Sequence, residues 1–402
     1  MRDNIIRFEG TTSELGRVNH AFPVLSLLSQ YLKRHGALQN IEIGWHCHLT
    51  GLTALAAEAV VGSGAKLALS ECNPKTTDQS AVEYMRSFGA KVHLGLGGPA
   101  KILRTRPHII SDTGLVLTSQ YLTNPCFPLI GSCEITTAGI LRLRSLPTMP
   151  LPVVNINDCQ LKTLIENFHG VGDGVMEALS ILTGKMWAGR KVAVAGYGRV
   201  GAGVAHYLRR AGAHVQVVEI DPVRCLIAHY DGFILAHLDE ALSNSELLVT
   251  ATGKKGLIGR REWLLAANGL LVVNVGHWSQ EVEPDLLRQI SETSYPNGII
   301  EEFVVKDALS GQKSVFLATG GSPANVVLES GSPEPTLIHL TTEILCLEYL
   351  MLMQLKNNCL PKGEIPVPHE VEEQASLLAL KALKLHADTC QLTQLEDKDR
   401  TC

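Results

Sequence analysis

The segment NINDCQLKTLIEN, residues 155–167, ends with an amine, a carboxylate and an amide close together. If the segment is a helix, Lys162 and Glu166 share one face, and Asn167 follows directly. Lys/Glu pairs at this spacing are common as surface ion pairs, so that interpretation stays open. The order Lys before Glu is the less stabilising one on a helix, which weakly favours chemistry, such as holding a substrate hydroxyl and taking its proton.

A second candidate site is the glycine-rich motif GYGRVG at residues 196–201. It follows an apolar strand candidate, KVAVA, and opens an amphipathic helix, and the next strand candidate ends in Glu219. This arrangement predicts a dinucleotide site, because the glycines allow a tight turn beside a pyrophosphate whose charge the helix N-terminus attracts. A carboxylate at this distance favours NAD over NADP, since it repels a ribose phosphate. The cofactor-binding residues predicted here are Gly196, Gly198, Arg199, Val200, Gly201 and Glu219.

Two histidines flank a cysteine in HCH at residues 46–48, a pattern that resembles part of a metal site. On a strand, His46 and His48 would share a face, but no second ligand cluster follows at zinc-like spacing, so no metal is predicted. The ten cysteines include no CxxC pair, and many lie in apolar stretches such as GSCEITT. This usage indicates reduced thiols in a cytoplasmic protein.

The composition narrows the possible functions further. Hydrophobic residues make up 45% of the 402-residue chain and charged residues 19%, which is a globular balance. The net charge of −5 and the lack of a basic tract argue against nucleic acid and anionic membranes as partners. The N-terminal residues show no signal-peptide pattern. The most apolar helix candidate, LIHLTTEILCLEYLMLMQL, contains Glu343 and Glu348, so it is predicted to be a buried core helix.

Two blocks of alternating strands and helices must position these motifs. The first block contains the strand candidates IEIGWH, KLALSEC, VHLG, HIISD and PLIGS, and the second runs from about Arg190 to about Gly321. Such alternation predicts the α/β class, with two domains whose parallel sheets are flanked by helices, the second a Rossmann NAD-binding domain. The predicted boundaries are 1–165 for a substrate-binding domain completed by about 334–365, 175–325 for the NAD-binding domain, and 366–402 for a C-terminal tail.

Four segments of the chain resemble segments of the S-adenosylhomocysteine hydrolase family. GYGRVGAG followed by VEIDP is similar to the family's cofactor fingerprint, and NVGHWSQEVE is similar to its N-x-G-H segment. NINDCQLKTLIEN resembles the family's N-V-N-D-S-x-T-K-x-K-F-D-N segment, and HLTGLTA resembles its H-M-T-x-E-T-A segment. The resemblance covers roughly residues 17–360 in the same order, and chemically unrelated motifs on two predicted domains carry it.

The resemblance implies a redox cycle on a nucleoside. Tightly held NAD oxidises a ribose 3′-hydroxyl, a base removes the acidified 4′ hydrogen, the 5′ substituent leaves, water adds, and the hydride returns. It implies that Lys162 activates the hydroxyl, with Asn167 as its partner and Glu166 at the sugar. The other catalytic residues implied are His48, Asp112 and His277. The resemblance also implies substrate contacts from Thr50 and Glu134, and NAD contacts from Thr136, Thr137, Asn274 and Asn325.

The sequence departs from the family pattern mainly where the base and the sugar are held. Glu166 stands where the family has Asp, and Leu52 replaces its adenine-contacting Glu. Ile135 replaces a ribose-binding Glu, unless Glu134 substitutes from one residue earlier. The family's G-H-P segment reads Gly-Ser-Pro at 331–333, and its Lys/Tyr-containing tail is lacking. The redox and proton-transfer residues persist, which predicts retained chemistry on an altered substrate.

Three functions are therefore considered. The first is hydrolysis of S-adenosylhomocysteine or a close nucleoside thioether, a reaction of one-carbon metabolism. The second is elimination without addition of water, a 4′,5′-dehydration of a nucleoside in a biosynthetic pathway. The third is a non-catalytic, NAD-binding regulatory paralogue. The expected partners are a small nucleoside or nucleoside thioether and further copies of the chain, as a dimer or tetramer.

Overall fold

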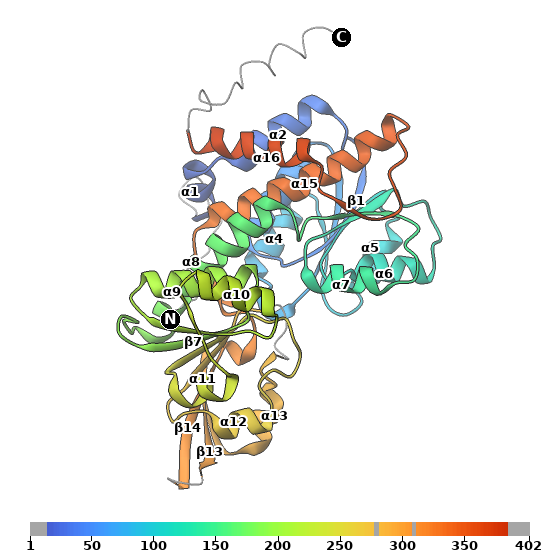
Figure 1. Cartoon of the computed structure of the whole chain (residues 1–402). Helices are drawn as coiled ribbons and strands as arrows, with labels where there is room; N and C mark the ends of the chain where they lie inside the picture. The colour runs from blue at the N-terminus through green and yellow to red at the C-terminus, as the bar shows by residue number, and fades with distance from the viewer. Residues whose placement is uncertain (1–13, 277–280, 308–310, 385–402) are drawn as a thin grey trace. The chain divides into compact units, whose positions relative to one another are not determined.

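The computed structural model describes residues 14–276, 281–307 and 311–384 (Figure 1). The internal contacts of the chain divide it into two units, each with its own sheet. Unit 1 comprises residues 1–162 and 333–402, and unit 2 comprises residues 163–332.

Unit 1 is built on a seven-stranded parallel sheet with the order β15-β6-β5-β4-β1-β2-β3. Most strand residues are buried, as expected of a parallel sheet covered by helices on both faces. Its strands are β1 (Glu42–Cys47), β2 (Lys66–Glu71), β3 (Lys91–His93), β4 (Ile109–Asp112), β5 (Gly131–Glu134), β6 (Pro152–Asn155) and β15 (Gly363–Pro366). Its helices are α1 (Glu14–Ala21), α2 (Val24–His35), α3 (Gly51–Gly62), α4 (Gln79–Ser87), α5 (Gly98–Arg104), α6 (Val116–Thr123), α7 (Thr137–Ser145), α15 (Pro333–Leu355) and α16 (His369–Ala382).

The 23-residue helix α15 is long and apolar enough to cross a membrane by length and composition. In the structure, 78% of its most apolar window is buried inside the protein, and it packs against α2, α3, α16, β4 and β5. Its two acidic residues, Glu343 and Glu348, are buried as well. The prediction of a buried core helix is confirmed.

The segment after residue 365 is more than the polar tail suggested by the sequence. As far as the structure describes it, the segment includes the end of β15 and the helix α16, which packs against α15 and α2 within unit 1. Ala375, Leu378 and Ala379 of α16 are buried. Pro366 ends β15, and Pro368 is the N-cap residue of α16.

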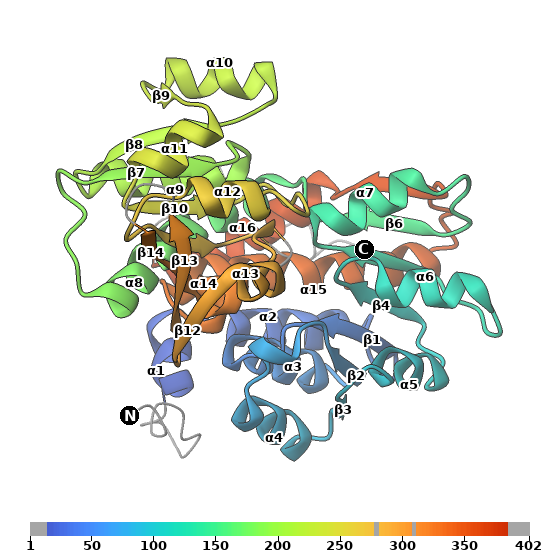
Figure 2. The same ribbon diagram turned by 90° about the horizontal axis from the view of Figure 1, so that it is seen from below.

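Unit 2 contains an eight-stranded sheet with the order β12-β13-β14-β11-β10-β7-β8-β9 (Figure 2). The strands from β14 to β9 are parallel, but β13 pairs antiparallel with both β12 and β14, which the sequence did not predict. The strands are β7 (Lys191–Ala195), β8 (His214–Val218), β9 (Ile234–Leu235), β10 (Leu247–Thr250), β11 (Leu271–Asn274), β12 (Ser291–Asn297), β13 (Ile300–Asp307) and β14 (Gly311–Ala318). The α-helices are α8 (Val171–Thr183), α9 (Arg199–Arg210), α10 (Pro222–Tyr230), α11 (Leu238–Asn244), α12 (Arg260–Leu265), α13 (Pro284–Ile290) and α14 (Ala324–Val327).

The HCH pattern at 46–48 does not assemble a metal site among the described residues. His46 is buried, and its Nδ1 lies 2.9 Å from Ser70 Oγ, whereas His48 contacts Thr76. Within the same part of the chain, no group of three or more His, Cys, Asp or Glu side chains is placed to hold a metal ion. The eight cysteines that the structure describes are free thiols.

Candidate active site

The carboxyl edge of the unit 1 sheet gathers several of the polar residues predicted for the substrate. The chain builds β1, β2 and β3 outward and then returns to β4 on the other side of β1, so the strand order reverses between β1 and β4. In open α/β sheets, ligands bind at the carboxyl ends of the strands beside such a point. His48 and Thr50 follow β1, Asp112 ends β4, and Glu134 ends β5 directly opposite Asp112 in register.

Asp112 caps a helix with both of its carboxylate oxygens. Oδ1 accepts hydrogen bonds from the backbone N–H groups of Thr113 (3.0 Å), Val116 (3.0 Å) and Leu117 (3.1 Å), and Oδ2 accepts one from Thr118 (2.8 Å). The donors belong to the loop after β4 and to the first turn of α6, which is the positive end of that helix. Burial raises the pKa of Asp112 to about 6, although these donors oppose the shift. Its carboxylate therefore holds the chain in place, and its catalytic role stays a prediction.

Glu134 is buried next to Asp112 and is bound on both oxygens. Oε1 accepts from the N–H groups of Gly114 (3.1 Å) and Thr136 (2.7 Å) and from the Thr136 hydroxyl (2.5 Å). Oε2 accepts from the N–H of Leu115 at 2.6 Å. Burial, with the negative charge of Asp112 as the next cause, raises the pKa of Glu134 to about 8. The side chain ties the loops after β4 and β5 together, and its predicted contact with the sugar stays a prediction.

The two threonines predicted to contact NAD use their hydroxyls differently. Thr136 Oγ1 accepts from the Gly139 N–H at 3.0 Å and so caps α7. A Cβ at position 139 would lie 2.1 Å from the carboxyl carbon of Glu134, so only glycine fits there. Thr137 is exposed, and its hydroxyl donates to Asn157 Oδ1 at 3.0 Å. Of the two, Thr137 is the one that presents its side chain to solvent.

His48 is held by a hydrogen bond that also sets its proton. Its Nδ1 lies 2.6 Å from Thr76 Oγ1, and that hydroxyl donates to the backbone carbonyl of Asn73 at 2.9 Å. Because a hydroxyl has one proton, Thr76 accepts from Nδ1–H, which places Nε2 in the acceptor form. An imidazole in this form can take up a proton, as the predicted relay requires. Thr50 caps α3 by accepting from the Thr53 N–H at 3.4 Å.

Lys162, Glu166 and Asn167 lie on a π-helix that spans Leu161–Gly170, where the sequence suggested an ordinary helix. A π-helix is bonded from i to i+5, is rare beyond a single turn, and is frequent at functional sites. Here it covers ten residues and continues directly into α8. All three side chains are half-buried. The unusual backbone is a structural reason to treat these residues as more than a surface ion pair.

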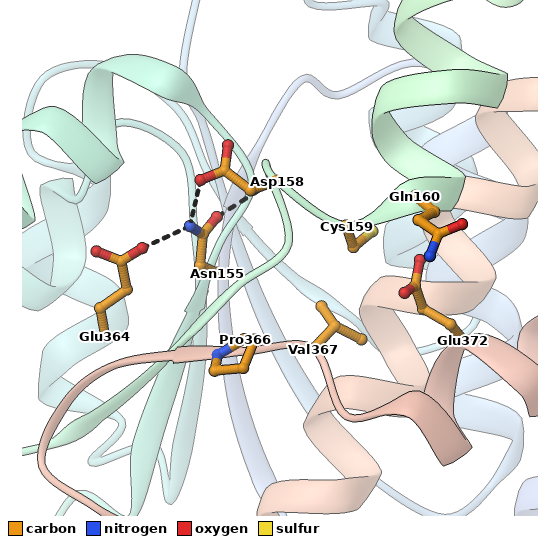
Figure 3. A pocket seen from close by; sticks show the side chains of 8 residues that line it. All are labelled: Asn155, Asp158, Cys159, Gln160, Glu364, Pro366, Val367 and Glu372. Atoms are coloured by element: carbon orange, nitrogen blue, oxygen red, sulfur yellow. Dashed lines mark hydrogen bonds between the residues drawn. The ribbon is translucent and has the colours of Figure 1, made fainter.

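A polar pocket of about 520 Å³ opens in unit 1 just before this π-helix (Figure 3). The amide nitrogen of Asn155 donates to Asp158 (2.8 Å) and to Glu364 (2.7 Å), and Arg144 donates to the same two carboxylates. The polar groups of this wall therefore largely satisfy one another. None of the predicted site residues lines the pocket, whose lining is Asn155, Asp158, Cys159, Gln160, Glu364, Pro366, Val367 and Glu372.

The glycine-rich loop of unit 2 has the shape that a pyrophosphate needs. Gly196 has φ +94°, and a Cβ there would lie 2.7 Å from the carbonyl oxygen of Ala251. A Cβ at Gly201 would lie 1.9 Å from the carbonyl oxygen of Gly196, so glycine alone lets α9 pack this closely on β7. At Gly198 the nearest atom to a Cβ is 3.7 Å away, and this residue caps α9 without a side chain of its own. The backbone and the first N–H groups of α9 thus fit a bound phosphate.

Glu219 follows β8 and braces the same loop. Its Oε2 accepts from the Tyr197 N–H at 2.7 Å, and its Oε1 accepts from the N–H groups of Ile220 (2.7 Å) and Asp221 (3.0 Å). A carboxylate offers about four acceptor positions, so these three bonds leave capacity for a ribose hydroxyl. The position and the remaining capacity fit the NAD ribose.

Asn274 holds three segments of unit 2 together. Its Oδ1 accepts from the Thr250 hydroxyl (3.0 Å) and the Gly276 N–H (2.9 Å), and its Nδ2 donates to the Gly321 carbonyl (2.8 Å). The residue is fully buried. These bonds join the ends of β10 and β11 to the segment after β14, and direct contact with NAD stays a prediction.

The remaining predicted residues of unit 2 are Asn325, His277, Arg199 and Val200. Asn325 is on α14, and its Oδ1 is buried with no hydrogen-bond partner among the described residues. Such an acceptor fits a bound group that donates, as a carboxamide does. His277 lies outside the described residues. Arg199 and Val200 form the first turn of α9, with Arg199 exposed.

Glu281 is a buried carboxylate beside the N-x-G-H segment that the sequence reasoning missed. It is fully buried, its Oε2 accepts from the N–H (3.0 Å) and hydroxyl (2.8 Å) of Thr252, and its Oε1 accepts from the Gly253 N–H (2.8 Å). Burial raises its pKa. A Cβ at Gly276 would lie 1.7 Å from Oε1, so the carboxylate that holds the loop after β10 also packs directly against the N-x-G-H segment. The two acidic residues inside NVGHWSQEVE, Glu281 and Glu283, were the available signal.

Comparison with known proteins places this geometry in a family. Residues 167–325 match the family model described as S-adenosyl-L-homocysteine hydrolase, NAD binding domain. The chain is 29% identical to S-inosyl-L-homocysteine hydrolase of Methanocaldococcus jannaschii, over 94% of this chain and 92% of that protein. It is 30% identical to adenosylhomocysteinase of Sulfolobus acidocaldarius (93% and 92% covered) and 32% identical to that of Gloeobacter violaceus (93% and 90% covered). The chain therefore belongs to the S-adenosylhomocysteine hydrolase family and carries the NAD-binding domain of that family.

Proposed function

We propose that this NAD-dependent hydrolase cleaves a purine nucleoside thioether of homocysteine at the 5′ carbon of the ribose. The observation that carries the proposal is the similarity to hydrolases of this substrate class over about 93% of the chain, through both units. The polar carboxyl edge of unit 1 and the nucleotide loop of unit 2 support it. NAD, when bound, supplies the oxidation of the ribose 3′ carbon and the later reduction.

We assign the proton steps to residues of the chain. Lys162 takes up the proton of the 3′-hydroxyl, with Asn167 holding that hydroxyl and Glu166 meeting the sugar. His48 takes up the proton that leaves the 4′ carbon and gives a proton to the sulfur that leaves the 5′ carbon, because its Nε2 is in the acceptor form when Thr76 holds Nδ1. His277 is proposed as a second proton-transfer group facing the sugar. Asp112 positions the loop between β4 and α6, which forms part of the substrate wall.

The residue type at position 52 indicates which purine base the substrate carries. Leu52 lies in the first turn of α3, next to the cap residue Thr50, where the family pattern has a carboxylate for adenine. A leucine accepts no hydrogen bond, so an exocyclic amine placed there would lose a partner, at a cost of about 1–3 kcal/mol. Hypoxanthine has no such amine, and one of the most similar relatives is named S-inosyl-L-homocysteine hydrolase. We therefore propose S-inosylhomocysteine as a better substrate than S-adenosylhomocysteine.

The decisive experiment compares the two thioethers with the purified enzyme by measuring homocysteine release. We expect kcat/KM for the inosyl compound to exceed that for the adenosyl compound by roughly 5- to 150-fold, the ratio equivalent to about 1–3 kcal/mol. Leu52→Glu should move the preference toward the adenosyl compound. If the two compounds were cleaved at equal rates, in wild type and in the variant alike, the assignment of the base would be refuted. Release of homocysteine from neither compound would refute hydrolysis.

Lys162→Ala tests the proton chemistry separately. The variant should keep bound NAD but lose the transient absorbance of reduced nicotinamide when substrate is added, whereas Lys356→Ala, at an exposed lysine of unit 1, should keep it. A Lys162→Ala enzyme that still reduces NAD would rule out the proposed role. Detection of a 4′,5′-unsaturated nucleoside would support dehydration, and the absence of any nicotinamide signal in wild type would support a regulatory paralogue.

A further inference from the structure

A cationic side chain from α10 lies beside the glycine-rich loop of unit 2. The nearest atom to a Cβ built at Gly198 is Nη1 of Arg224, at 3.7 Å. Gly198 is the glycine at which the backbone approaches a pyrophosphate, so the direction of its missing side chain is the direction of the phosphates. Arg224 belongs to the first turn of α10, in the strand–helix segment after the glycine motif. Its guanidinium therefore lies where the phosphates of a dinucleotide are expected.

Asp221 holds the Arg224 side chain through an ion pair. Asp221 is the N-cap of α10, and its Oδ1 accepts from the N–H groups of Val223 (2.8 Å) and Arg224 (3.3 Å). Its Oδ2 lies 3.8 Å from Arg224 Nε, which is too long for a hydrogen bond. The ion pair therefore leaves the N–H donors of the guanidinium available to a ligand. The Arg224 side chain is 53% exposed, so a ligand in solution can reach it.

We infer that Arg224 binds the pyrophosphate of NAD, in addition to the backbone N–H groups of the loop. The pyrophosphate is dianionic, whereas the loop and the start of α9 offer only partial positive charge. A guanidinium adds a full positive charge and a fork of donors that matches phosphate oxygens. The inference concerns the cofactor of the family's NAD-binding domain, so it is independent of the substrate proposed above.

The charges near Arg224 favour the pyrophosphate over a 2′-phosphate as its ligand. An arginine near the end of the second strand accommodates the 2′-phosphate of NADP, whereas an acidic residue there binds the free ribose hydroxyl of NAD. Here Glu219 supplies the acidic residue, and Asp221 places a second carboxylate on the same segment. Both carboxylates repel a phosphate on the ribose. The position of Arg224 Nη1 beside Gly198 matches the pyrophosphate instead.

The experiment measures the Kd of NAD in the holoenzyme, by exchange of bound NAD against labelled NAD at several ionic strengths. Arg224→Gln should raise this Kd by roughly tenfold or more and flatten its dependence on ionic strength, because salt screens a charged contact. Arg224→Lys should recover part of the affinity, since lysine keeps the charge but not the fork. Arg261→Gln, at an exposed arginine of α12 that pairs with Asp239, is the matched control and should bind NAD as wild type does. Unchanged far-UV circular dichroism shows that each variant is folded.

Asp221→Asn separates a contact with the cofactor from a structural ion pair. Asparagine caps a helix as well as aspartate does, so α10 keeps its first turn while Arg224 loses its ion pair. This variant should hold NAD at least as tightly as wild type, because a negative charge near the pyrophosphate is gone. A loss of NAD affinity as large as that of Arg224→Gln would overturn the inference, since Arg224 would then act through the ion pair.

Two other results would also overturn the phosphate contact. The first is an Arg224→Gln enzyme with the wild-type Kd for NAD, whether or not its displacement by NADP changes. The second is a weaker Kd whose dependence on ionic strength equals that of wild type, which would assign Arg224 to the adenine ring instead of the pyrophosphate.

Discussion

The substitution Asp112→Asn separates a positioning role from a catalytic one. The carboxylate accepts three N–H groups on Oδ1, from the loop after β4 and from α6, and the Thr118 N–H on Oδ2. An asparagine can keep its carbonyl oxygen toward the first three donors. Its amino group then faces the Thr118 N–H. Two donors would oppose each other inside the core, where the Thr118 nitrogen and Asp112 Oδ2 are 2.8 Å apart in the wild type.

The expected cost follows from that one buried donor. Leaving a buried N–H without an acceptor costs about 1–3 kcal/mol, and the lost charge adds to this because bonds to ionised groups are stronger than neutral ones. For a unit of roughly this size, each kcal/mol lowers Tm by about 2–4 °C. We therefore expect Tm to fall by roughly 2–12 °C. A general acid or base, by contrast, contributes about 10²–10⁴-fold to the rate.

The assay pairs calorimetric unfolding with steady-state rates at pH 7, well below the transition. Asp112→Asn should lower Tm as stated and reduce kcat by less than about tenfold. Asp78→Asn is the matched control, because Asp78 caps α4 of the same unit through one bond, from the Ser80 N–H at 2.9 Å, and asparagine caps as well as aspartate. An Asp112→Asn enzyme with an unchanged Tm and a rate reduced 100-fold or more would refute the positioning role.

Three further predictions concern the loops and the relay. Gly201→Ala puts a Cβ 1.9 Å from the Gly196 carbonyl oxygen, so α9 must move, and NAD affinity should fall at least about tenfold, measured as cofactor retained after desalting; full retention would contradict this. The pKa of Glu134 is raised in the folded state, so its contribution to stability is present at low pH and is lost as the pH rises toward about 8. Glu134→Gln should therefore flatten the dependence of Tm on pH between about 6 and 8.5. Parallel curves of Tm against pH for wild type and variant would contradict this. Thr76→Val removes the acceptor of the His48 Nδ1–H, so the pH profile of kcat should shift with little change in Tm, and an unchanged profile would argue against the relay.

The nucleotide loop could be predicted from the sequence because its constraints are local. The contact that excludes a side chain at Gly201 is made by Gly196, five residues earlier, and both belong to one short motif between a strand and a helix. The hydrogen bond from the Tyr197 N–H to Glu219 joins the two strand–loop segments that the motif already specifies. Fold class, cofactor and family followed from this motif and its neighbours, and the structure and the comparisons confirm them.

The roles of the strand-end polar residues could not be predicted in the same way. Asp112, Glu134 and Asn274 end strands at positions where a polar side chain can either face a ligand or cap the chain. For Glu134 and Asn274 the deciding partners lie on segments that only the fold brings near: the Leu115 N–H donates to Glu134, and the Gly321 carbonyl accepts from Asn274. A residue type and its alignment with a family motif do not distinguish these two uses.

Backbone irregularity accounts for the other differences. The π-helix at Leu161–Gly170 was not predicted, because the spacing of Lys162 and Glu166 suits an α-helix and a π-helix of this length is rare. The antiparallel strands β12 and β13 extend one edge of a parallel sheet, where the alternation of strands and helices gives no information. The more polar composition near the C-terminus suggested a tail, although the helix α16 within it packs against α15.

The buried carboxylates of unit 1 order a loop that we propose as part of the substrate wall. Asp112 and Glu134 together accept hydrogen bonds from the whole loop between β4 and α6, including Gly114 and Leu115. Ordering that loop is part of folding, so its entropic cost is not subtracted from binding. In the proposed site, the substrate therefore does not have to order this loop when it binds. Substitutions in this loop should therefore lower stability before they lower the rate, whereas substitutions at His48 should do the reverse.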